Sequence, residues 1–376
     1  MNKDETEIMS LMFRSYYEKA DGLYVNELSK REIGYIPFNG TMIRHQKVDP
    51  GNAGNGMRIF AMKTVPRHLY NSVAFYRKPD ERLMKEKEWL GAEVIFDLDA
   101  DHIEGSSEMS YENTLDEVKK HTERLIHRYL TGILGLSEDS LSIYFSGGRG
   151  YHVHILKEEL FDMNSDQRRE ISNLVRGEGL KSKEFCEVAK NGIYSGKGWV
   201  NDIDIAFSEA MEKTIFGNVE NDALLSRIQK HHEKKNDMKA EEQKKKRITP
   251  GAEKYAFLLK DELELLDRII NSMREELSCE IDEPVTTDVH RLIRFTNSLH
   301  GKTGLQVKRV KIEELHSFEP LNEAIPKIFL EGEMKVSSKT PFTIRMLKKN
   351  FTIDKDTVVP KYVGIYSVLS GKGMLE

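Results

Sequence analysis

Two aspartates, Asp97 and Asp99, follow a short apolar run at residues 94–96. The run predicts a buried strand. Because side chains alternate along a strand, both carboxylates lie on one face, about 7 Å apart along the backbone. Carboxylates this close repel each other and lose hydration unless a positive charge lies between them. Oxygen ligands favour Mg²⁺ or Mn²⁺, so the pair indicates a divalent metal site. Taken alone, Asp-x-Asp is explained equally well by an acidic strand end without function.

A glycine-rich loop, Ser146–Gly150, is the second stretch that can do chemistry. Its three glycines let the backbone adopt positive φ and approach a ligand closely. Ser146, the loop N–H groups and Arg149 can bind phosphate oxygens. His152 and His154 follow on a strand and share one of its faces. The alternative is a tight hairpin with an exposed arginine, which needs fewer glycines.

A third polar stretch, residues 280–304, adds an acid and several basic side chains. Asp282 can end a strand and supply a third carboxylate, with Asp288 as the competing candidate. Residues 286–294 predict a short helix with a threonine cap.

Basic residues gather in the same stretch. Arg291 and Arg294 are three residues apart, so they are neighbours on the predicted helix. His300 and Lys302 follow in a turn bounded by glycines. Four basic side chains near an acid indicate an anion site, and a basic surface helix is the alternative.

The bulk composition excludes several classes of protein. The chain has 376 residues, 39% hydrophobic and 32% charged, with a net charge of −5. Any nucleic-acid binding must therefore use a local basic patch. Two cysteines, Cys186 and Cys279, form neither a disulfide framework nor a four-cysteine zinc site. No apolar stretch approaches the roughly 20 residues of a membrane span, and the N-terminus is no signal peptide. We expect an intracellular, cytoplasmic protein that does not bind a membrane.

The remaining patterns predict the elements that position these residues. They are helices over 3–20, 65–90 and 115–135 and one starting at Ser165, and strands over 31–38, 41–45, 141–145, 151–155 and 305–310. Arg31, Arg44 and His45, in the first two strands, either line a phosphate site or are surface charges.

The predicted fold class is α+β. Residues 1–179 form the first part of an α/β core, 180–279 a mostly helical insertion, and 280–376 the second part of the core. Within the insertion, residues 230–247 are almost entirely polar and rich in lysine. Such a run favours a solvated helix or a flexible linker over a nucleic-acid contact.

Two superficial motif matches are excluded. Asp97 and Asp99 resemble the nucleophile strand of haloacid-dehalogenase-type phosphatases, but Ala100 and Asp101 stand where that motif has Gly and Thr. The run Gly301–Thr303 lacks the spacing of a P-loop.

The three polar stretches are specific as a set. They read Asp-x-Asp, then Ser-Gly-x-Arg-Gly-x-His, then Asp…Arg-Leu-Ile-Arg…Ser-Leu-His-Gly-Lys-Thr-Gly. In this order the chain resembles the catalytic small subunit of the archaeal and eukaryotic type of DNA primase, and the archaeal branch in particular. The resemblance covers most of the chain and is weakest over 190–250. It implies a catalytic core of mixed sheets flanked by helices.

The resemblance also implies residue roles. It assigns metal binding and catalysis to Asp97, Asp99 and Asp282, and binding of the nucleotide triphosphate to Ser146, Arg149, His152, Arg294 and His300. The implied cofactors are two Mg²⁺ or Mn²⁺ ions. Many relatives carry a cysteine- and histidine-rich zinc element before the glycine loop. Residues 100–140 contain no cysteine, so we predict no zinc.

The implied function is a DNA-dependent primase that makes short RNA, and possibly DNA, primers on single-stranded DNA by two-metal nucleotidyl transfer. The implied partners are the template, NTPs or dNTPs, and a large primase subunit carrying an iron–sulfur cluster, within nucleoid-associated replication machinery. Three alternatives remain open: a repair or lesion-bypass polymerase that extends primers, a metal-dependent phosphohydrolase, and a regulatory nucleotide-binding module.

Overall fold

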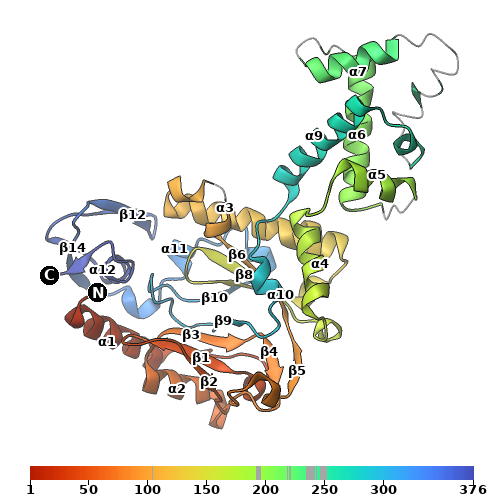
Figure 1. Cartoon of the computed structure of the whole chain (residues 1–376). Coiled ribbons are helices and arrows are strands. Elements are labelled where there is room, and N and C mark those ends of the chain that lie inside the picture. The colour runs from red at the N-terminus through yellow and green to blue at the C-terminus, as the bar shows by residue number, and fades with distance from the viewer. Residues whose placement is uncertain are drawn as a thin grey trace. The chain divides into compact units, whose positions relative to one another are not determined.

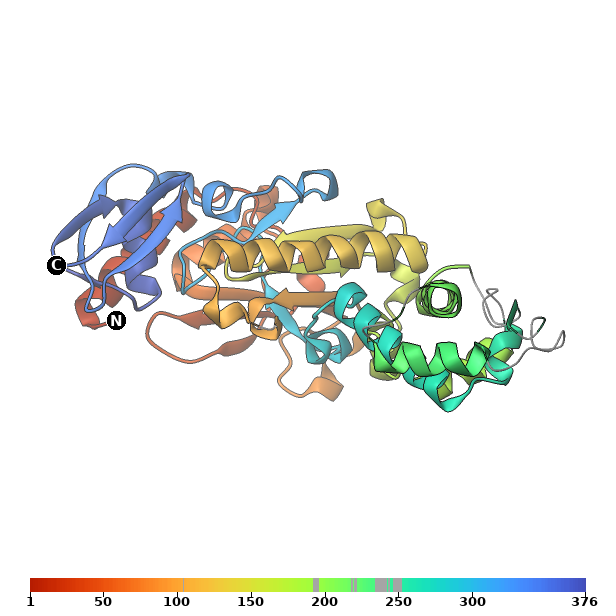
Figure 2. The same ribbon diagram turned by 90° about the horizontal axis from the view of Figure 1, so that it is seen from above.

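The computed structural model describes residues 1–103, 105–191, 196–217, 219, 222–233, 242, 244–245 and 252–376. The described chain packs into two compact units (Figures 1 and 2). The first comprises Met1–Glu123, Ser137–Glu170 and Glu280–Glu376, and the second comprises Arg124–Leu136 and Ile171–Cys279. We predicted that residues 180–279 form an insertion between two parts of a core, 1–179 and 280–376. This three-part division stays a prediction. The charged run 230–247 lies mostly outside the described residues.

One four-stranded antiparallel sheet of the first unit has the order β2-β1-β3-β9. Its strands are β1 (Ile33–Pro37), β2 (Ile43–Gln46), β3 (Pro66–Ser72) and β9 (Leu292–Arg294). Tyr70 of β3 pairs with Gly34 on one side and with Arg294 on the other. Directly paired residues share a face, so His68 and Tyr70 lie on the same face as Arg294.

Two helices pack beside this sheet. They are α1 (Lys3–Lys19) and α2 (Gly56–Thr64), which contact each other, and α1 also contacts β3. Phe13 and Tyr17 of α1 are fully buried, and the Tyr17 hydroxyl donates to the Pro66 carbonyl oxygen at 3.3 Å. The helix predicted for residues 3–20 is therefore confirmed.

The second four-stranded sheet has the order β10-β7-β8-β6, again with antiparallel neighbours. Its strands are β6 (Val94–Asp99), β7 (Leu141–Phe145), β8 (Gly150–Ile155) and β10 (Lys308–Val310). The helices α3 (Tyr111–Arg124), α4 (Ser165–Arg176) and α10 (Glu283–Thr287) belong wholly or partly to the same unit, and α10 packs on β6. An apolar cluster that includes Tyr76, Ile95, Val285 and Ile293 fills the core.

Smaller elements complete the first unit. They are the hairpin of β4 (Ala74–Tyr76) and β5 (Trp89–Ala92), helix α11 (Pro320–Glu323), the hairpin of β12 (Phe342–Met346) and β13 (Lys349–Ile353), and a sheet of β11 (Glu333–Ser337), β14 (Thr357–Pro360) and β15 (Met374–Leu375) with helix α12 (Lys361–Leu369). The two chain ends meet here (Figure 1), where the Leu375 N–H donates to Glu5 Oε1 at 3.1 Å.

The second unit is helical. It contains a π-helix (Leu125–Ile133), α5 (Ser182–Lys190), α6 (Trp199–Phe216), α7 (Ala223–Glu233) and α9 (Lys260–Leu277). Its core buries Ile203, Phe207, Met211 and Leu266. The predicted α+β class is confirmed.

Two local predictions are wrong. Residues 65–90 form β3, β4 and β5 rather than a helix, because β3 pairs with β1 and β9 and the β4–β5 hairpin closes on itself. Residues 286–294 do not form one helix. Helix α10 ends at Thr287, and Leu292–Arg294 pairs with β3 as β9. In both cases, pairing between distant strands overrides local propensity.

A buried charge network anchors the start of β6. Glu93 contacts the Arg31 guanidinium and accepts a hydrogen bond from His154 Nδ1 at 2.8 Å. The Glu93 carbonyl accepts from Arg168 at 2.8 Å, and Arg31, Arg168 and Glu93 are all buried. Burial alone would raise the pKa of Glu93, but the Arg31 charge and the His154 hydrogen bond lower it to about 2.

This network predicts an acid-dependent stability. Glu93→Gln leaves the Arg31 charge buried without its partner, which lowers the free energy of unfolding at neutral pH by roughly 3 kcal/mol. The folded-state pKa of Glu93 lies below its usual 4.5. The contribution of Glu93 is therefore complete above that value and is lost as the pH falls toward 2. Urea unfolding of wild type and variant should show their difference shrinking with falling pH.

The exposed acid Glu331 provides a matched control. Glu331→Gln should change the stability little at any pH. A difference between wild type and Glu93→Gln that stays constant from neutral to acidic pH would contradict the role of the carboxylate charge.

Candidate active site

Three carboxylates meet where β6 ends. Asp97 and Asp99 are half-buried while their neighbour Leu98 is fully buried, so both acids lie on one face of β6. Asp282 precedes α10, and its N–H donates to the Asp97 carbonyl oxygen at 2.9 Å. The period-two prediction for Asp97 and Asp99 is confirmed, and the strand-to-helix connection brings Asp282 beside them.

The electrostatics of this acidic cluster are unfavourable without a cation. Burial, followed by the charges of Asp99 and Asp282, raises the pKa of Asp97 to about 7. Arg291 and Arg294 oppose this increase. Within the described part of the chain, no three His, Cys, Asp or Glu side chains are already arranged to hold a metal ion. The oxygen-only donor set and the mutual repulsion of the carboxylates nevertheless fit a divalent cation such as Mg²⁺ or Mn²⁺.

The glycine loop joins β7 to β8 directly beside these acids. Gly150 pairs with Asp99, and a Cβ at Gly150 would lie 2.0 Å from the Leu98 carbonyl oxygen. Gly147 has φ +76°, and a Cβ there would lie 2.7 Å from the Cβ of His300. Two of the loop glycines are thus required by close approach, and one of them also by its backbone conformation.

Arg149 of the loop and His152 of β8 lie beside the acids, and Ser146 binds within the loop. Ser146 Oγ accepts from the Gly148 N–H at 3.2 Å. The Arg149 guanidinium forms ion pairs with Asp101 and, at 3.6 Å, with Asp99. His152 pairs with Asp97 across the sheet, and its Nε2 lies 3.6 Å from Asp97 Oδ1.

His152 is a neutral side chain with an unused hydrogen-bonding atom. Burial, and then the nearby His154, Arg294 and Arg291, lower its pKa well below the usual value. Among the described residues, its Nδ1 is one of the few buried polar atoms without a hydrogen-bond partner. Such an atom next to acids and a glycine loop is typical of a ligand site.

Arg294 approaches the acids from the other sheet. Its Nη1 donates to His68 Nδ1 at 2.7 Å, and its guanidinium lies 5.4 Å from the centre of the Tyr70 ring. Burial, followed by the charges of Arg294, Arg67 and Lys302, lowers the pKa of His68 to about 3. His68 is therefore a neutral acceptor that fixes the direction of Arg294.

His300 lies between this sheet and the glycine loop. Its ring centre is 5.3 Å from that of His68, and a Cβ at Gly148 would lie 3.1 Å from its Nε2. The Arg67 Nε donates to the Gly301 carbonyl oxygen at 2.9 Å and so holds the turn that carries His300. The five side chains predicted to bind phosphate thus come from two sheets and one turn. Arg149, His152 and Arg294 interact with the acids. Ser146 and His300 lie at the glycine loop beside them.

Some of the other candidates have partners elsewhere. Arg31 is fully buried on Glu93, and His154 is bound to the same carboxylate. Arg44 and His45 approach the buried carboxylate of Glu32 at 2.8 and 3.5 Å.

Asp288 accepts from the His290 N–H at 2.9 Å in the turn after α10. The structure therefore brings Asp282, rather than Asp288, next to Asp97.

Sequence reasoning missed His68, Tyr70 and Thr303. The alternation that places His68 and Tyr70 on one face was a detectable signal, but the stretch was interpreted as a helix. Thr303 was part of an incomplete P-loop pattern and of the motif Ser-Leu-His-Gly-Lys-Thr-Gly, but it was given no role of its own.

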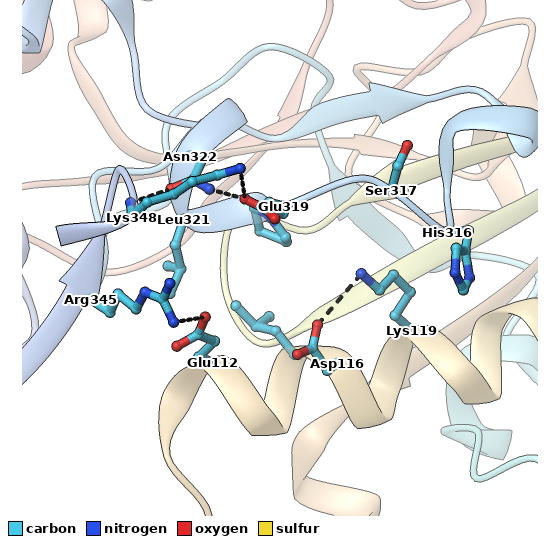
Figure 3. A pocket seen from close by; sticks show the side chains of 12 residues that line it. Glu112, Asp116, Lys119, His316, Ser317, Glu319, Leu321, Asn322, Arg345 and Lys348 are labelled. Carbon is cyan, nitrogen blue, oxygen red and sulfur yellow. Dashed lines mark hydrogen bonds and ion pairs between the residues drawn. The ribbon is translucent and has the colours of Figure 1, made fainter. Parts of the chain in front are cut away.

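A separate hollow of about 490 Å³ lies against α3, away from the acids (Figure 3). Its charged lining is balanced, because Glu112 pairs with Arg345, Asp116 with Lys119, and Glu319 with Lys348. No surplus positive charge remains among these pairs to bind a triphosphate.

Comparisons with known proteins identify relatives over nearly the whole chain. Residues 96–312 match the family model described as "DNA primase small subunit". The chain is 41% identical to the DNA primase small subunit PriS of Picrophilus torridus, over 95% of both chains. It is 37% identical to the Thermoplasma volcanium protein of the same name, over 97% of this chain and 96% of the relative. For the Methanosarcina acetivorans protein of that name, the identity is 32% over 99% of this chain and 97% of the relative. In the described part of the chain, none of the helices is long and apolar enough to cross a membrane.

The geometry of Gly147 predicts a specific loss of anion binding. Gly147→Ala must move the loop away from His300, because the new Cβ would overlap the His300 Cβ. We expect the affinity for a nucleoside triphosphate to fall by about tenfold or more. Calorimetric titration with ATP and Mg²⁺ measures this change.

Gly371 provides the matched control, since it has φ +73° and open space around it. Gly371→Ala carries the same backbone strain, about 1 kcal/mol, and should leave ATP affinity unchanged. Equal affinities for wild type and Gly147→Ala would argue against a ligand role for the loop.

Proposed function

The chain belongs to the DNA primase small-subunit family, and from this premise we propose that it is a nucleotidyltransferase that makes short RNA primers, and possibly DNA primers, on single-stranded DNA. The observation that carries the proposal is the meeting of three carboxylates with a cluster of phosphate-binding groups. A strand end, a helix start, a glycine loop and the turn 300–304 contribute to it.

In the proposed mechanism, Asp97, Asp99 and Asp282 hold two Mg²⁺ or Mn²⁺ ions. When bound, these ions activate the attacking hydroxyl and neutralise charge on the reacting phosphates. No zinc ion is part of the proposal.

The other site residues bind and orient the triphosphate. Ser146, the loop N–H groups and Arg149 meet it from one sheet, while Arg294 and His300 meet it from the other side. His68 and Tyr70 restrict the Arg294 guanidinium, so little rotamer freedom is lost when the substrate binds. Arg149 must leave Asp101 to reach a phosphate. Fixed positive groups around developing negative charge are the main source of rate enhancement in this class of site.

The proposed partners follow from the family. We propose that a single-stranded template binds along a local basic groove with little sequence preference and a strong dependence on salt. The name of the relatives, small subunit, supports a heterodimer with a large primase subunit. The proposed location is inside the cell, with the replication machinery.

Replacing Asp97 should lower the activity and raise the stability of the protein. Asp97→Asn should lower template-dependent synthesis by at least about a hundredfold, because the metal ions lose a ligand. The same change removes a charge from a repelling cluster. In the presence of a chelator, the free energy of unfolding should therefore rise, by about 1 kcal/mol. Primer synthesis assays and urea unfolding measure the two effects.

Asp139→Asn, at an exposed position, is the matched control and should change neither quantity. Full activity of Asp97→Asn would overturn the assignment of the acids.

The mode of synthesis is tested with and without a primer. The purified chain is incubated with single-stranded DNA, labelled NTPs or dNTPs, and Mg²⁺ or Mn²⁺. Short products without a primer would establish initiation. Products only with an annealed primer would favour a repair or lesion-bypass polymerase, or initiation that needs the partner subunit. Nucleotide hydrolysis without any product would overturn the proposal in favour of a phosphohydrolase.

A further inference from the structure

Thr303 connects the site histidine His300 to the glycine loop. Its hydroxyl lies 2.6 Å from the Gly147 carbonyl oxygen and 3.1 Å from His300 Nδ1. The Leu305 N–H donates to the same hydroxyl at 3.2 Å. Thr303 is buried, so this arrangement is enclosed by the protein.

The hydrogen-bond directions are determined by chemistry. A carbonyl oxygen only accepts, so the Thr303 hydroxyl must donate its single proton to Gly147. Its oxygen can then only accept from the other two neighbours. His300 Nδ1 must therefore carry a proton and donate it to Thr303.

The other ring nitrogen of His300 faces the phosphate-binding loop. A Cβ built on Gly148 would lie 3.1 Å from His300 Nε2 and 3.5 Å from Ser146 Oγ. In a neutral imidazole with the proton on Nδ1, this Nε2 is an acceptor. A bare acceptor cannot donate a hydrogen bond to a phosphate oxygen.

The surroundings keep the free ring neutral. Burial, followed by Arg294, His68, Lys302 and Arg67, lowers the pKa of His300 well below its usual value. His68 carries no proton on the nitrogen that accepts from Arg294, and its own pKa is about 3. The permanent charges facing His300 are therefore Arg294, Arg67 and Lys302, and a bound triphosphate would oppose all three.

We infer that Thr303 is a positioning residue that holds His300 in the tautomer protonated on Nδ1, so that Nε2 takes up one proton from solvent when a nucleoside triphosphate binds. The proton-uptake part of this inference rests on the proposed function, whereas the tautomer does not. The protonated Nε2 then donates to a phosphate oxygen, while Nδ1 continues to donate to Thr303.

The tautomer is tested by nitrogen-15 NMR of the histidine side chains in the free protein. The His300 signals, assigned by their loss in His300→Gln, should show a protonated Nδ1 and an unprotonated Nε2. Thr303→Ser retains the hydroxyl and should give the wild-type pattern. Thr303→Val removes the acceptor and should shift the signals toward protonated Nε2. A protonated Nε2 in the free wild-type protein at neutral pH would overturn the inference, even if the valine variant does not fold.

Proton uptake is tested by calorimetry. ATP is titrated into protein already equilibrated with Mg²⁺, in buffers of different ionisation enthalpy at pH about 7.5. Wild type and Thr303→Ser should take up the same number of protons per ATP. Thr303→Val should take up fewer, by as much as one, because its neutral Nε2–H can donate directly.

The pH dependence has a defined sign. Uptake of a proton on binding means that the wild-type affinity for ATP falls as the pH rises, by at most tenfold per pH unit. The affinity of Thr303→Val should vary less with pH. Equal uptake by wild type and Thr303→Val would overturn the proton-uptake part of the inference. Failure of ATP to bind at all would contradict the proposed function as well, while the NMR result on the tautomer would stand alone.

Discussion

The site depends on the register between β6 and β8. This register places Asp97 opposite His152 and Asp99 opposite Gly150. A shift by one residue would turn both carboxylates into the apolar core and expose Phe96 and Leu98. The close approach of Gly150 to the Leu98 carbonyl oxygen helps to fix the register, because a side chain at this position would separate the strands. The same contact brings the glycine loop next to the acids, so one packing constraint positions both halves of the candidate site.

The pKa values of the carboxylates at the two ends of the β6 region are shifted in opposite directions. Glu93, just before the strand, is surrounded by Arg31 and His154, which hold its pKa at about 2. Asp97 lies four residues later, where burial and two further carboxylates raise its pKa to about 7. The buried network around Glu93 anchors the strand, whereas the acidic cluster at Asp97 is the cation site that we propose. The stabilising contacts of Glu93 are thus separate from the carboxylate repulsion at Asp97, although the two acids are only four residues apart.

Local patterns in the sequence predicted the placement of single side chains better than the way the elements pair. The period of two placed Asp97 and Asp99 on one face, and the glycine loop between β7 and β8 lies where it was expected. The helix predicted over 65–90 hid His68 and Tyr70, because the strand character of β3 comes from pairing with β1 and β9. Likewise, nothing local distinguishes Arg31, which is buried on Glu93, from Arg149, which is half-exposed at the acids. Burial of a long cationic side chain depends on partners that the sequence does not place.

The protonation pattern of the histidines could not be predicted from the sequence, for a related reason. His68 and His300 lie close together, yet His68 accepts on Nδ1 from Arg294, whereas His300 donates from Nδ1 to Thr303. The residue type is the same, and only the neighbouring donor or acceptor decides the direction. Since both rings are neutral in the free protein, the permanent positive charge beside the loop comes from arginine and lysine alone. If the proposed nucleotide site is correct, its affinity for an anion would be set in two stages. Fixed charges would attract the ligand first, and the His300 ring would become a donor only when the ligand's own charge makes its protonation favourable.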